Sequence, residues 1–389
     1  MKVCLLSFSD IGSDWRIRRH AQLLLDLGHD VRTVGLPSMK PGGLPWPAEH
    51  VVLPGWTLRE KATQALHLAT VRLRATTAET VYWRSARHRA MYEAARRGPV
   101  ADLYVANDWN TLPIAARLAT GEGGRYAYDT HEYAVEEHAD RARWRLVWPP
   151  FLRALEAKHI GDAVWVSTVS EGIAALLQED HHLTVRPSVI RNVPPYQEMQ
   201  LREAAGQVTV LFHGGLLGDR GLEPLIDSVP QWSPHFRLVI RGNGDEAYVA
   251  ALRRRADATG QGGRINFEQA VPHDRVVQAA NETADIGIHP MSTMTRQTRF
   301  AMPNKFFEYT MAGLAVCVVS GSEMARSVEE LGHGVLLPAA DPDSISQTIN
   351  ALNYGSINAY KAKSLTAARS LSWVNEQLRL AALYPAVAP

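Results

Sequence analysis

Cysteine is scarce in this sequence: only Cys4 and Cys317 occur among 389 residues, and both fall inside apolar runs. This excludes a disulfide framework and a cysteine-based metal site, and it is typical of a reduced intracellular protein. Long apolar runs are missing too. The stretch after Lys2 ends at Asp10, too short for a signal peptide, and no run approaches the roughly 18 residues of a membrane span. We therefore expect a cytoplasmic protein without a transmembrane segment.

The sequence also has little excess charge. A formal net charge of +1 excludes a bulk polyanion binder, and no RNA-binding signature is present, so we expect no nucleic-acid partner. The charge is nevertheless unevenly distributed along the sequence, because positions 59 to 97 contain nine basic residues and only three acidic ones. The nine are Arg59, Lys61, Arg72, Arg74, Arg84, Arg87, Arg89, Arg96 and Arg97. Such a region can face anionic lipid, a phosphate-bearing acceptor or water, and water is the ordinary case.

What the sequence does contain is a regular alternation of short apolar runs and helical stretches. The length favours two domains. Strand-like runs are expected at 3–8, 31–34, 103–106, 126–128, 164–167 and 188–190, and again at 208–212, 237–240, 264–267, 286–288 and 316–319. The pattern breaks at Asn192–Pro195 and a polar stretch follows to Gly206. This predicts an α/β protein with two doubly wound Rossmann-like domains facing each other across a cleft.

The expected domain boundaries follow from the same pattern. We predict a first Rossmann-like domain at 1–195, a linker at 196–206 and a second Rossmann-like domain at 207–371. A final helix is expected at 372–389.

The segment from Met302 to Val316 carries the clearest chemical signal. Pro303 and Asn304 suit a helix start, with the Asn side chain as a cap, and Gly313 suits its end. A packing face is expected from Phe306, Phe307, Thr310 and Met311. The helix N-terminus and Lys305 together favour a bound phosphate, and Glu308 lies one turn further, where a carboxylate can accept hydrogen bonds from a ribose.

This segment resembles the donor-binding motif of glycosyltransferase family 4, retaining enzymes with the GT-B fold, in the subgroup with a Pro-Asn-Lys-Phe-Phe-Glu-Tyr version. Similar matches in the expected order cover nearly the whole chain. They are the segment from Arg16 to Val34, Ala106–Trp109, Asp129–Glu132, Thr168–Ser170, Arg191–Pro194, Phe212–Leu222, Arg241–Gly244, and the terminal helix from Ser372 to Tyr384.

The resemblance implies a retaining, metal-independent, hexosyltransferase-like enzyme. It would move a sugar from a nucleoside-diphosphate donor, with a UDP- or GDP-sugar expected, to a hydroxyl of a glycan, a lipid-linked saccharide or a small molecule. No cofactor is implied beyond the donor itself. A lipid-linked acceptor would place the enzyme peripherally at the inner face of a membrane.

The resemblance implies that the N-terminal domain at 1–195 binds the acceptor, that the C-terminal domain at 207–371 binds the nucleotide sugar, and that the helix at 372–389 crosses back to the N-terminal domain. It also assigns candidate site residues. The catalytic set is His131, Arg220, Lys305 and Glu308. The donor-binding set is Gly214, Gly215, Arg220, Gly242, Asn243, Pro303, Asn304, Lys305, Phe306 and Glu308. The acceptor-binding set is Asp10, Gly12, Ser13, Arg16 and Asp108. His131 is expected to bond the donor sugar without acting as a nucleophile, with Asp129 or Glu132 orienting it or meeting the acceptor.

Two positions depart from the family pattern. Gly215 stands where the glycine-rich loop usually has an arginine, which leaves Arg220 as the loop's one cation, and Phe300 stands where the first of two glutamates is usual. These departures leave room for a non-catalytic nucleotide-sugar-binding or scaffolding protein. A sugar-nucleotide epimerase or a phosphorylase of the same fold is a further alternative. A dinucleotide oxidoreductase is disfavoured because the first βα turn, Phe8–Ser13, lacks Gly-x-Gly-x-x-Gly.

The segment from Arg141 to Phe151 mixes cations with indoles. It can seat at a lipid interface, but Trp144 and Trp148 are four residues apart, which favours one packed helix face.

Overall fold

The computed structural model describes residues 1–38, 43–56, 63, 68, 70–71 and 74–384. The chain divides into two compact units. Unit 1 is Met1–Arg191 together with the chain from Gln377 onward, and unit 2 is Asn192–Glu376. Three residues of the basic region between positions 59 and 97 lie outside the described residues, namely Arg59, Lys61 and Arg72.

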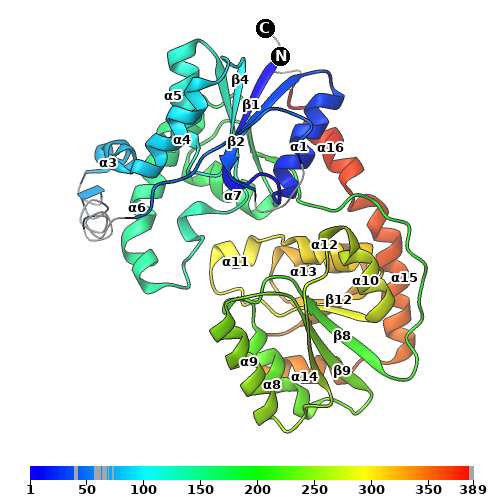
Figure 1. Cartoon of the computed structure of the whole chain (residues 1–389). Helices are drawn as coiled ribbons and strands as arrows, with labels where there is room; N and C mark the ends of the chain where they lie inside the picture. The colour runs from blue at the N-terminus through cyan, green and yellow to red at the C-terminus, as the bar shows by residue number, and fades with distance from the viewer. Residues whose placement is uncertain (39–42, 57–62, 64–67, 69, 72–73, 385–389) are drawn as a thin grey trace. The chain divides into compact units, whose positions relative to one another are not determined.

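In its described part, unit 1 has a seven-stranded parallel sheet in the order β3-β2-β1-β4-β5-β6-β7 (Figure 1). The strands are β1 (Lys2–Asp10), β2 (Asp30–Leu36), β3 (Ala48–His50), β4 (Leu103–Asn107), β5 (Arg125–Asp129), β6 (Val166–Thr168) and β7 (Ser188–Val189). The helices are α1 (Trp15–Asp26), α3 (Ala78–Arg84), α4 (Ala86–Arg97), α5 (Leu112–Glu122), α6 (Ala142–His159) and α7 (Glu171–Asp180).

Unit 2 repeats the plan, within the described residues, with six parallel strands in the order β10-β9-β8-β11-β12-β13. The strands are β8 (Val208–His213), β9 (Phe236–Arg241), β10 (Ile265–Glu268), β11 (Ile286–His289), β12 (Ala315–Val319) and β13 (Gly334–Leu337). The helices are α8 (Leu222–Ser228), α9 (Glu246–Ala258), α10 (Val276–Thr283), α11 (Arg296–Phe300), α12 (Asn304–Met311), α13 (Glu323–Leu331), α14 (Pro342–Asn350) and α15 (Tyr354–Ser370). A last helix, α16 (Trp373–Ala381), begins in unit 2 and ends in unit 1.

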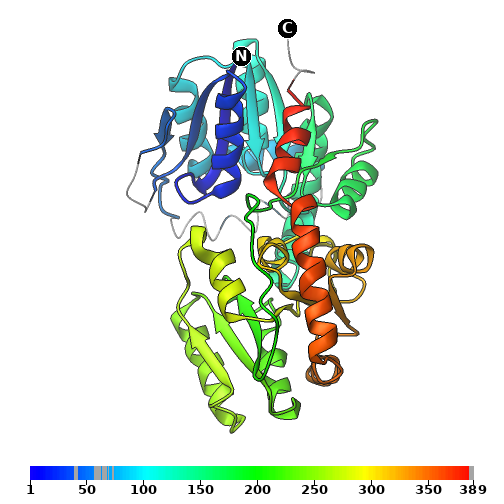
Figure 2. The ribbon, with the colours of Figure 1, turned by 90° about the vertical axis from the view of Figure 1, so that its right-hand side faces the viewer.

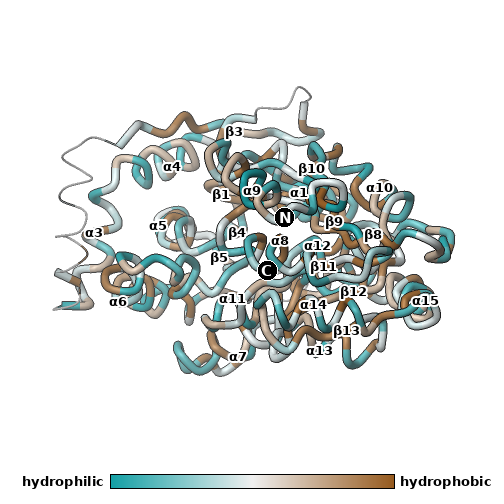
Figure 3. The backbone as a smooth tube through the Cα atoms, turned by 90° about the horizontal axis from the view of Figure 1, so that it is seen from below, coloured by the Kyte–Doolittle hydropathy of each residue, from teal (hydrophilic) through white to brown (hydrophobic). Residues whose placement is uncertain are grey.

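The predicted fold class is confirmed: two α/β units, each built on a parallel sheet. Central strands are buried on both faces, as β4, β8, β11 and β12 show, so they read in the sequence as continuous apolar runs. The helices instead alternate hydrophilic and hydrophobic stretches along the tube of Figure 3, as expected where one face packs on a sheet.

Each sheet has one point where the strand order reverses direction. In unit 1 it lies between β1 and β4, and in unit 2 between β8 and β11. Sheets of this kind bind ligands outside the carboxyl ends of the strands at that point. The loops that follow these four strands are therefore where each unit's functional residues are sought.

The end of the chain packs on unit 1. Tyr384 is buried, its hydroxyl contacts the ring of His20 in α1, and its own ring meets Trp165 edge-on at 5.8 Å. Figure 2 shows this last segment following α15 and α16. Residues 196–205 form neither helix nor strand.

Several local predictions are corrected. Pro303, not Asn304, is the N-cap of α12, and no side chain caps this end. The pattern also missed β3 and β13. The expected packing of Trp144 and Trp148 is confirmed, because their rings stack at 4.9 Å in α6. The two cysteines are buried and free. No helix among the described residues is long and apolar enough to span a membrane.

Candidate functional site

In unit 2 the turns after β8 and β9 touch through their backbones. Gly214 has φ = +117° and Gly242 has φ = +156°, conformations that disfavour any other residue. A Cβ placed on Gly242 would lie 1.8 Å from the carbonyl oxygen of Gly214. The contact continues where the amide of Leu216 donates to the carbonyl of Asn243 at 2.9 Å. Glycines at these two positions thus let bare backbone line the carboxyl end of the sheet.

Lys305 lies beside this turn, in the first turn of α12. Its side chain is buried, only 8% exposed, and its ammonium lies 4.5 Å from the ring centroid of Phe212. Burial, with the positive charge of Arg220 adding to it, lowers the pKa of Lys305 to about 7. Among the described residues no hydrogen bond or ion pair engages this ammonium. A buried cation without an anion is costly, so the site is suited to take one up.

The helix start reinforces this preference. The first amides of α12 have no intrahelical acceptor, because Pro303 is the N-cap and the preceding backbone is extended. Arg220 is near by, one quarter exposed, with its Nε 3.3 Å from Asp219. The predicted Lys305, Arg220 and helix start therefore belong to one electropositive region of unit 2.

Glu308 is held by a partner that the sequence analysis did not assign. Its Oε2 lies 2.9 Å from Nε2 of His213, the last residue of β8. Burial alone would raise the pKa of Glu308, but His213, His273 and Lys305 outweigh it and lower this pKa. The amide of His213 in turn donates to the hydroxyl of Tyr309 at 2.9 Å. Glu308 is thus an ionised carboxylate fixed in orientation.

A second unassigned residue is His289, at the end of β11. It is fully buried, and within the described part of the chain neither ring nitrogen has a hydrogen-bond partner. Its ring stacks on Phe212 at 6.1 Å. Burial, with the charges of Lys305, Arg220 and His213, keeps the pKa of His289 well below its usual value. The sequence could have indicated His289 as a site residue, because it directly follows the predicted strand at 286–288, and residues at the ends of central strands line the ligand site of such sheets.

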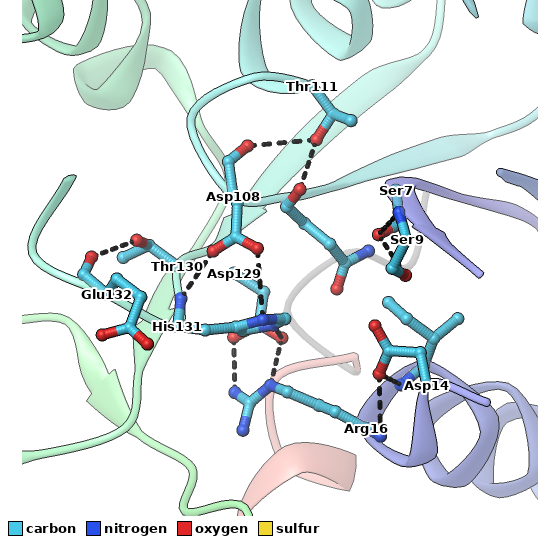
Figure 4. A network of polar contacts seen from close by, with 12 residues as sticks. Ser7, Ser9, Asp14, Arg16, Asp108, Thr111, Asp129, Thr130, His131 and Glu132 are labelled. Carbon is cyan, nitrogen blue, oxygen red and sulfur yellow. Dashed lines mark hydrogen bonds and ion pairs between the residues drawn. The ribbon is translucent and has the colours of Figure 1, made fainter. Parts of the chain in front are cut away.

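In unit 1 four of the expected residues form one network (Figure 4). Nδ1 of His131 lies 3.2 Å from Asp108, and Nε2 lies 3.4 Å from Asp129. The guanidinium of Arg16 donates two hydrogen bonds to the carboxylate of Asp129, of 2.9 and 2.6 Å, and a third to the carbonyl of Ile190 at 2.7 Å. The amide of His131 also donates to Asp108 at 2.9 Å.

Local structure fixes the shape of this network. Asp108 follows β4 with φ = +65°, which is unusual for a residue other than glycine. Its amide donates to the carbonyl of Asp129, the last residue of the adjacent strand β5. Strain held by neighbouring contacts is a frequent property of functional positions.

The charges of the network follow from mutual pairing. Burial and the positive charge of Arg16 would both lower the pKa of His131. The carboxylates of Asp108 and Asp129 have the larger effect and raise this pKa to about 10. Burial alone would raise the pKa of Asp129, yet Arg16 and His131 hold it well below the usual range. His131 is therefore an imidazolium at neutral pH, which cannot act as a nucleophile or a base.

The acceptor-binding candidates divide into two groups. Asp10 accepts a hydrogen bond from the amide of Gly12 at 2.9 Å, and the hydroxyl of Ser13 donates to the carbonyl of Asp10, so these three form one tight turn after β1. Arg16 is buried and its guanidinium is committed to Asp129 and Ile190, while Asp108 is committed to His131. Arg16 therefore does not contact a ligand directly, and it acts by holding Asp129 in place.

Residues 207–353 match the model of a family described as Glycosyl transferases group 1. The matched residues all lie within unit 2. Solved structures resemble the whole chain in fold. Sucrose-phosphate synthase from Thermosynechococcus elongatus aligns with a TM-score of 0.76 at 15% identity, covering 99% of this chain and 98% of that one. HepE of Anabaena in complex with UDP and glucose aligns with a TM-score of 0.69 at 14% identity, covering 99% of both chains.

A third relative in structure is the lipopolysaccharide outer core galactosyltransferase WaaB, with a TM-score of 0.67 at 11% identity and full coverage of both chains. At such identities the likeness establishes the fold alone, which is GT-B. No curated protein matches the chain in sequence.

Both departures from the family pattern lie in the matched part of unit 2. Phe300 ends α11 and is partly buried, so no carboxylate stands there. Gly215 has room for a side chain, since a Cβ placed there would have its nearest neighbour 3.9 Å away in Leu217. Phe306, of the predicted donor-binding set, has a fully buried side chain that packs against Phe307, and its amide is bonded to Pro303. The described residues contain no group of three or more His, Cys, Asp or Glu placed to hold a metal.

Proposed function

We propose that this protein is a retaining glycosyltransferase that moves a sugar from a nucleoside-diphosphate donor to a hydroxyl acceptor without a metal. The observation that carries the proposal is Lys305, a buried cation without an anionic partner in the described residues, set in the first turn of α12 beside the Gly214 turn. The group 1 match over 207–353 supports the same reaction class.

In this proposal unit 2 stabilises the departing diphosphate. Its developing negative charge is met by the side chains of Lys305 and Arg220 and by the amides of Asn304 and Lys305. In other enzymes a single hydrogen-bond donor of this kind accelerates the reaction by about 10² to 10³. Glu308, held by His213, accepts hydrogen bonds from the ribose hydroxyls. HepE, a relative in fold, is described in complex with UDP-glucose, which makes a UDP-sugar the first donor to test and a GDP-sugar the second.

The bond changes balance without an external base. The acceptor oxygen forms a bond to the anomeric carbon on the face from which the diphosphate oxygen departs, and the acceptor proton passes to that departing oxygen. His131 donates a hydrogen bond to the sugar by giving up the longer of its two carboxylate contacts, the one from Nε2 to Asp129 at 3.4 Å. Retention of configuration, a hydroxyl acceptor and metal independence are all parts of this proposal.

The test begins with binding. We expect UDP or GDP, but not both equally, to raise the melting temperature of the wild type, since a ligand at 100 times its dissociation constant adds about 2.7 kcal/mol of stability. Lys305→Ala should abolish the shift, whereas Lys363→Ala, an exposed lysine of the same unit, should keep it. Failure of UDP, GDP, TDP and ADP alike to stabilise the protein would overturn the donor assignment.

Turnover is then tested with the donor that binds. Release of the nucleoside diphosphate is measured with and without EDTA, and the anomeric configuration of the product is read by NMR. We expect transfer with retention, insensitive to EDTA and lost in His131→Ala. An inverted product or a strict metal requirement would contradict the mechanism.

A non-catalytic nucleotide-sugar binder is the second candidate, because Phe300 and Gly215 replace two charged residues that the family pattern leads one to expect. It predicts donor binding without transfer or hydrolysis. An epimerase would instead change the sugar of the donor without releasing the diphosphate. The same NMR experiment separates these outcomes.

A further inference from the structure

Unit 1 contains a cavity of about 400 Å³ whose walls are mainly aromatic. This volume is within the range of about 300–1,000 Å³ that small-molecule sites occupy. Its rings come from five parts of the unit, namely the end of β1, the segment after β3, the α3–α4 region, the β4–α5 turn and α6. The ring-bearing residues are Phe8, Trp56, Tyr82, His88, Trp109, Trp148 and Phe151.

These rings support one another. Tyr82 and His88 stack at 3.9 Å, and Phe8 meets His88 edge-on at 5.6 Å. Trp109 lies 6.1 Å from both Trp148 and Phe151. The cavity is therefore a preformed set of ring faces and edges, which favours a flat apolar occupant.

Three polar ring groups of the walls are engaged within the protein, whereas Oδ1 of Asn110 is buried without a hydrogen-bond partner among the described residues. The hydroxyl of Tyr82 donates to the carbonyl of Asn110 at 2.5 Å, and the indole N–H of Trp109 faces Glu137 at 3.4 Å. Nδ1 of His88 lies 3.0 Å from the carbonyl of Tyr82, and burial lowers the pKa of His88 to about 4, so this ring is neutral. A monosaccharide, which needs several hydrogen bonds to its hydroxyls, would find few here.

The formal charges among the lining residues are positive. Arg84 and Arg87 line the cavity, and no acidic residue is among its described lining. Arg87 makes one long hydrogen bond, of 3.4 Å to the carbonyl of Pro54, and lies over the ring of Trp56 at 5.8 Å. Arg84 is exposed. This charge calls for an anionic group on the occupant.

The cavity and the His131 network share the same loops. Trp109 and Asn110 directly follow Asp108, which holds His131, and Phe8 precedes the turn that begins at Asp10. These are the loops after β4 and β1, the two strands at the reversal point of the sheet.

We propose that this aromatic cavity binds the acceptor, and that the acceptor has a flat, apolar, unsaturated body and an acidic group that pairs with Arg84 and Arg87. The inference rests on the proposed function, because it names the acceptor class for that reaction. Two sources share this chemistry and also carry a hydroxyl that can accept the sugar: a hydroxyaryl carboxylic acid and a hydroxyaryl phosphate.

The experiment measures binding by quenching of tryptophan fluorescence, since three tryptophans line the cavity. The probes are 4-hydroxycinnamate, its methyl ester, 4-hydroxyphenyl phosphate and maltose. We expect one of the two anions to bind at least tenfold more tightly than the ester and maltose. Tighter binding of 4-hydroxycinnamate identifies an aryl carboxylic acid, and tighter binding of 4-hydroxyphenyl phosphate identifies an aryl phosphate. If neither anion binds more tightly than the ester or maltose, the proposal is overturned.

Variants locate the binding. Arg87→Gln and Trp148→Ala should each weaken the preferred anion about tenfold, whereas Arg96→Gln, on the exposed side of the same helix α4 as Arg87, should leave it unchanged. Circular dichroism checks that Trp148→Ala is folded, and Arg87→Gln tests the cavity without altering its rings. Equal weakening by Arg96→Gln would show a general charge effect and refute the assignment.

Failure of this inference can be told from failure of the proposed function. Lys305→Ala should lose UDP or GDP binding and keep the anion. If nucleotides bind the wild type and neither anion does, the acceptor class is wrong and the donor assignment stands. If an anion binds and no nucleotide does, the cavity is a binding site and the glycosyltransferase proposal fails.

Discussion

Replacing Lys305 by methionine should make the ligand-free protein more stable while removing its affinity for the donor. The side chain is 8% exposed, and burial together with Arg220 lowers its pKa from the ordinary value of 10.5 to about 7. In the unfolded chain the ammonium is fully hydrated and keeps its proton up to about pH 10.5. Folding at neutral pH therefore requires either burying a charge or releasing a proton.

The size of the effect follows from these two pKa values. Because the folded pKa is lowered, the unfolded state binds more protons between pH 7 and 10.5, and stability rises with pH across that window. At pH 7 the penalty is about 4 kcal/mol, and at pH 10 it falls to about 1 kcal/mol. Methionine has a similar length and no charge, so Lys305→Met should gain about 2 to 4 kcal/mol at pH 7 and little at pH 10.

The assay is urea denaturation of wild type and variant at pH 7 and pH 10, with and without saturating UDP. For a unit of this size about 2 kcal/mol corresponds to a rise of roughly 4–8 °C in melting temperature. Bound diphosphate should reverse the order of stability, because it supplies the missing anion only to the wild type. A variant less stable than the wild type at pH 7, or a gain that does not change with pH, would refute the reasoning.

Three further outcomes are expected. Gly215→Arg should leave the melting temperature unchanged, because a Cβ fits at this position, and should bind UDP more tightly, because it adds a cation. Gly214→Ala should instead lower the stability by about 1 kcal/mol or more, because Gly214 has a positive φ. Tyr309→Phe should lower the free energy of unfolding in urea by about 1–3 kcal/mol, since it leaves a buried amide unpaired. Arg16→Met should cost about 3–5 kcal/mol in the same assay, because it leaves a buried carboxylate without its cation; a loss under about 1 kcal/mol would contradict the ion-pair account.

The parts of the fold that the sequence predicts well are those where burial imposes composition. β4, β8 and β12 are buried along their whole length and stand out as apolar runs. β3 and β13 carry little such signal, because Ala48–His50 is largely exposed at an edge and Gly334–Leu337 is mostly half-buried. Their pairing comes from neighbouring strands, which local composition does not record.

The candidate site divides in the same way. Glycine positions and the α12 segment follow from local motifs, since a positive φ or a helix start is a property of a few adjacent residues. The roles of His213 and His289 depend on β8 and β11 lying side by side, a long-range pairing. Arg16 shows the limit most clearly, because it is bound to a carboxylate 113 residues away.

The two groups of candidate residues differ in how their charges balance. In unit 1 the carboxylates of Asp108 and Asp129 are matched by Arg16 and an imidazolium, so the network is internally neutral and suits a neutral sugar. In unit 2 the carboxylate of Glu308 lies against His213, and among the described residues the ammonium of Lys305 forms no hydrogen bond or ion pair with a carboxylate. A site that lacks one negative charge recognises an anion more strongly than one already neutral, since only the first gains an ion pair on binding.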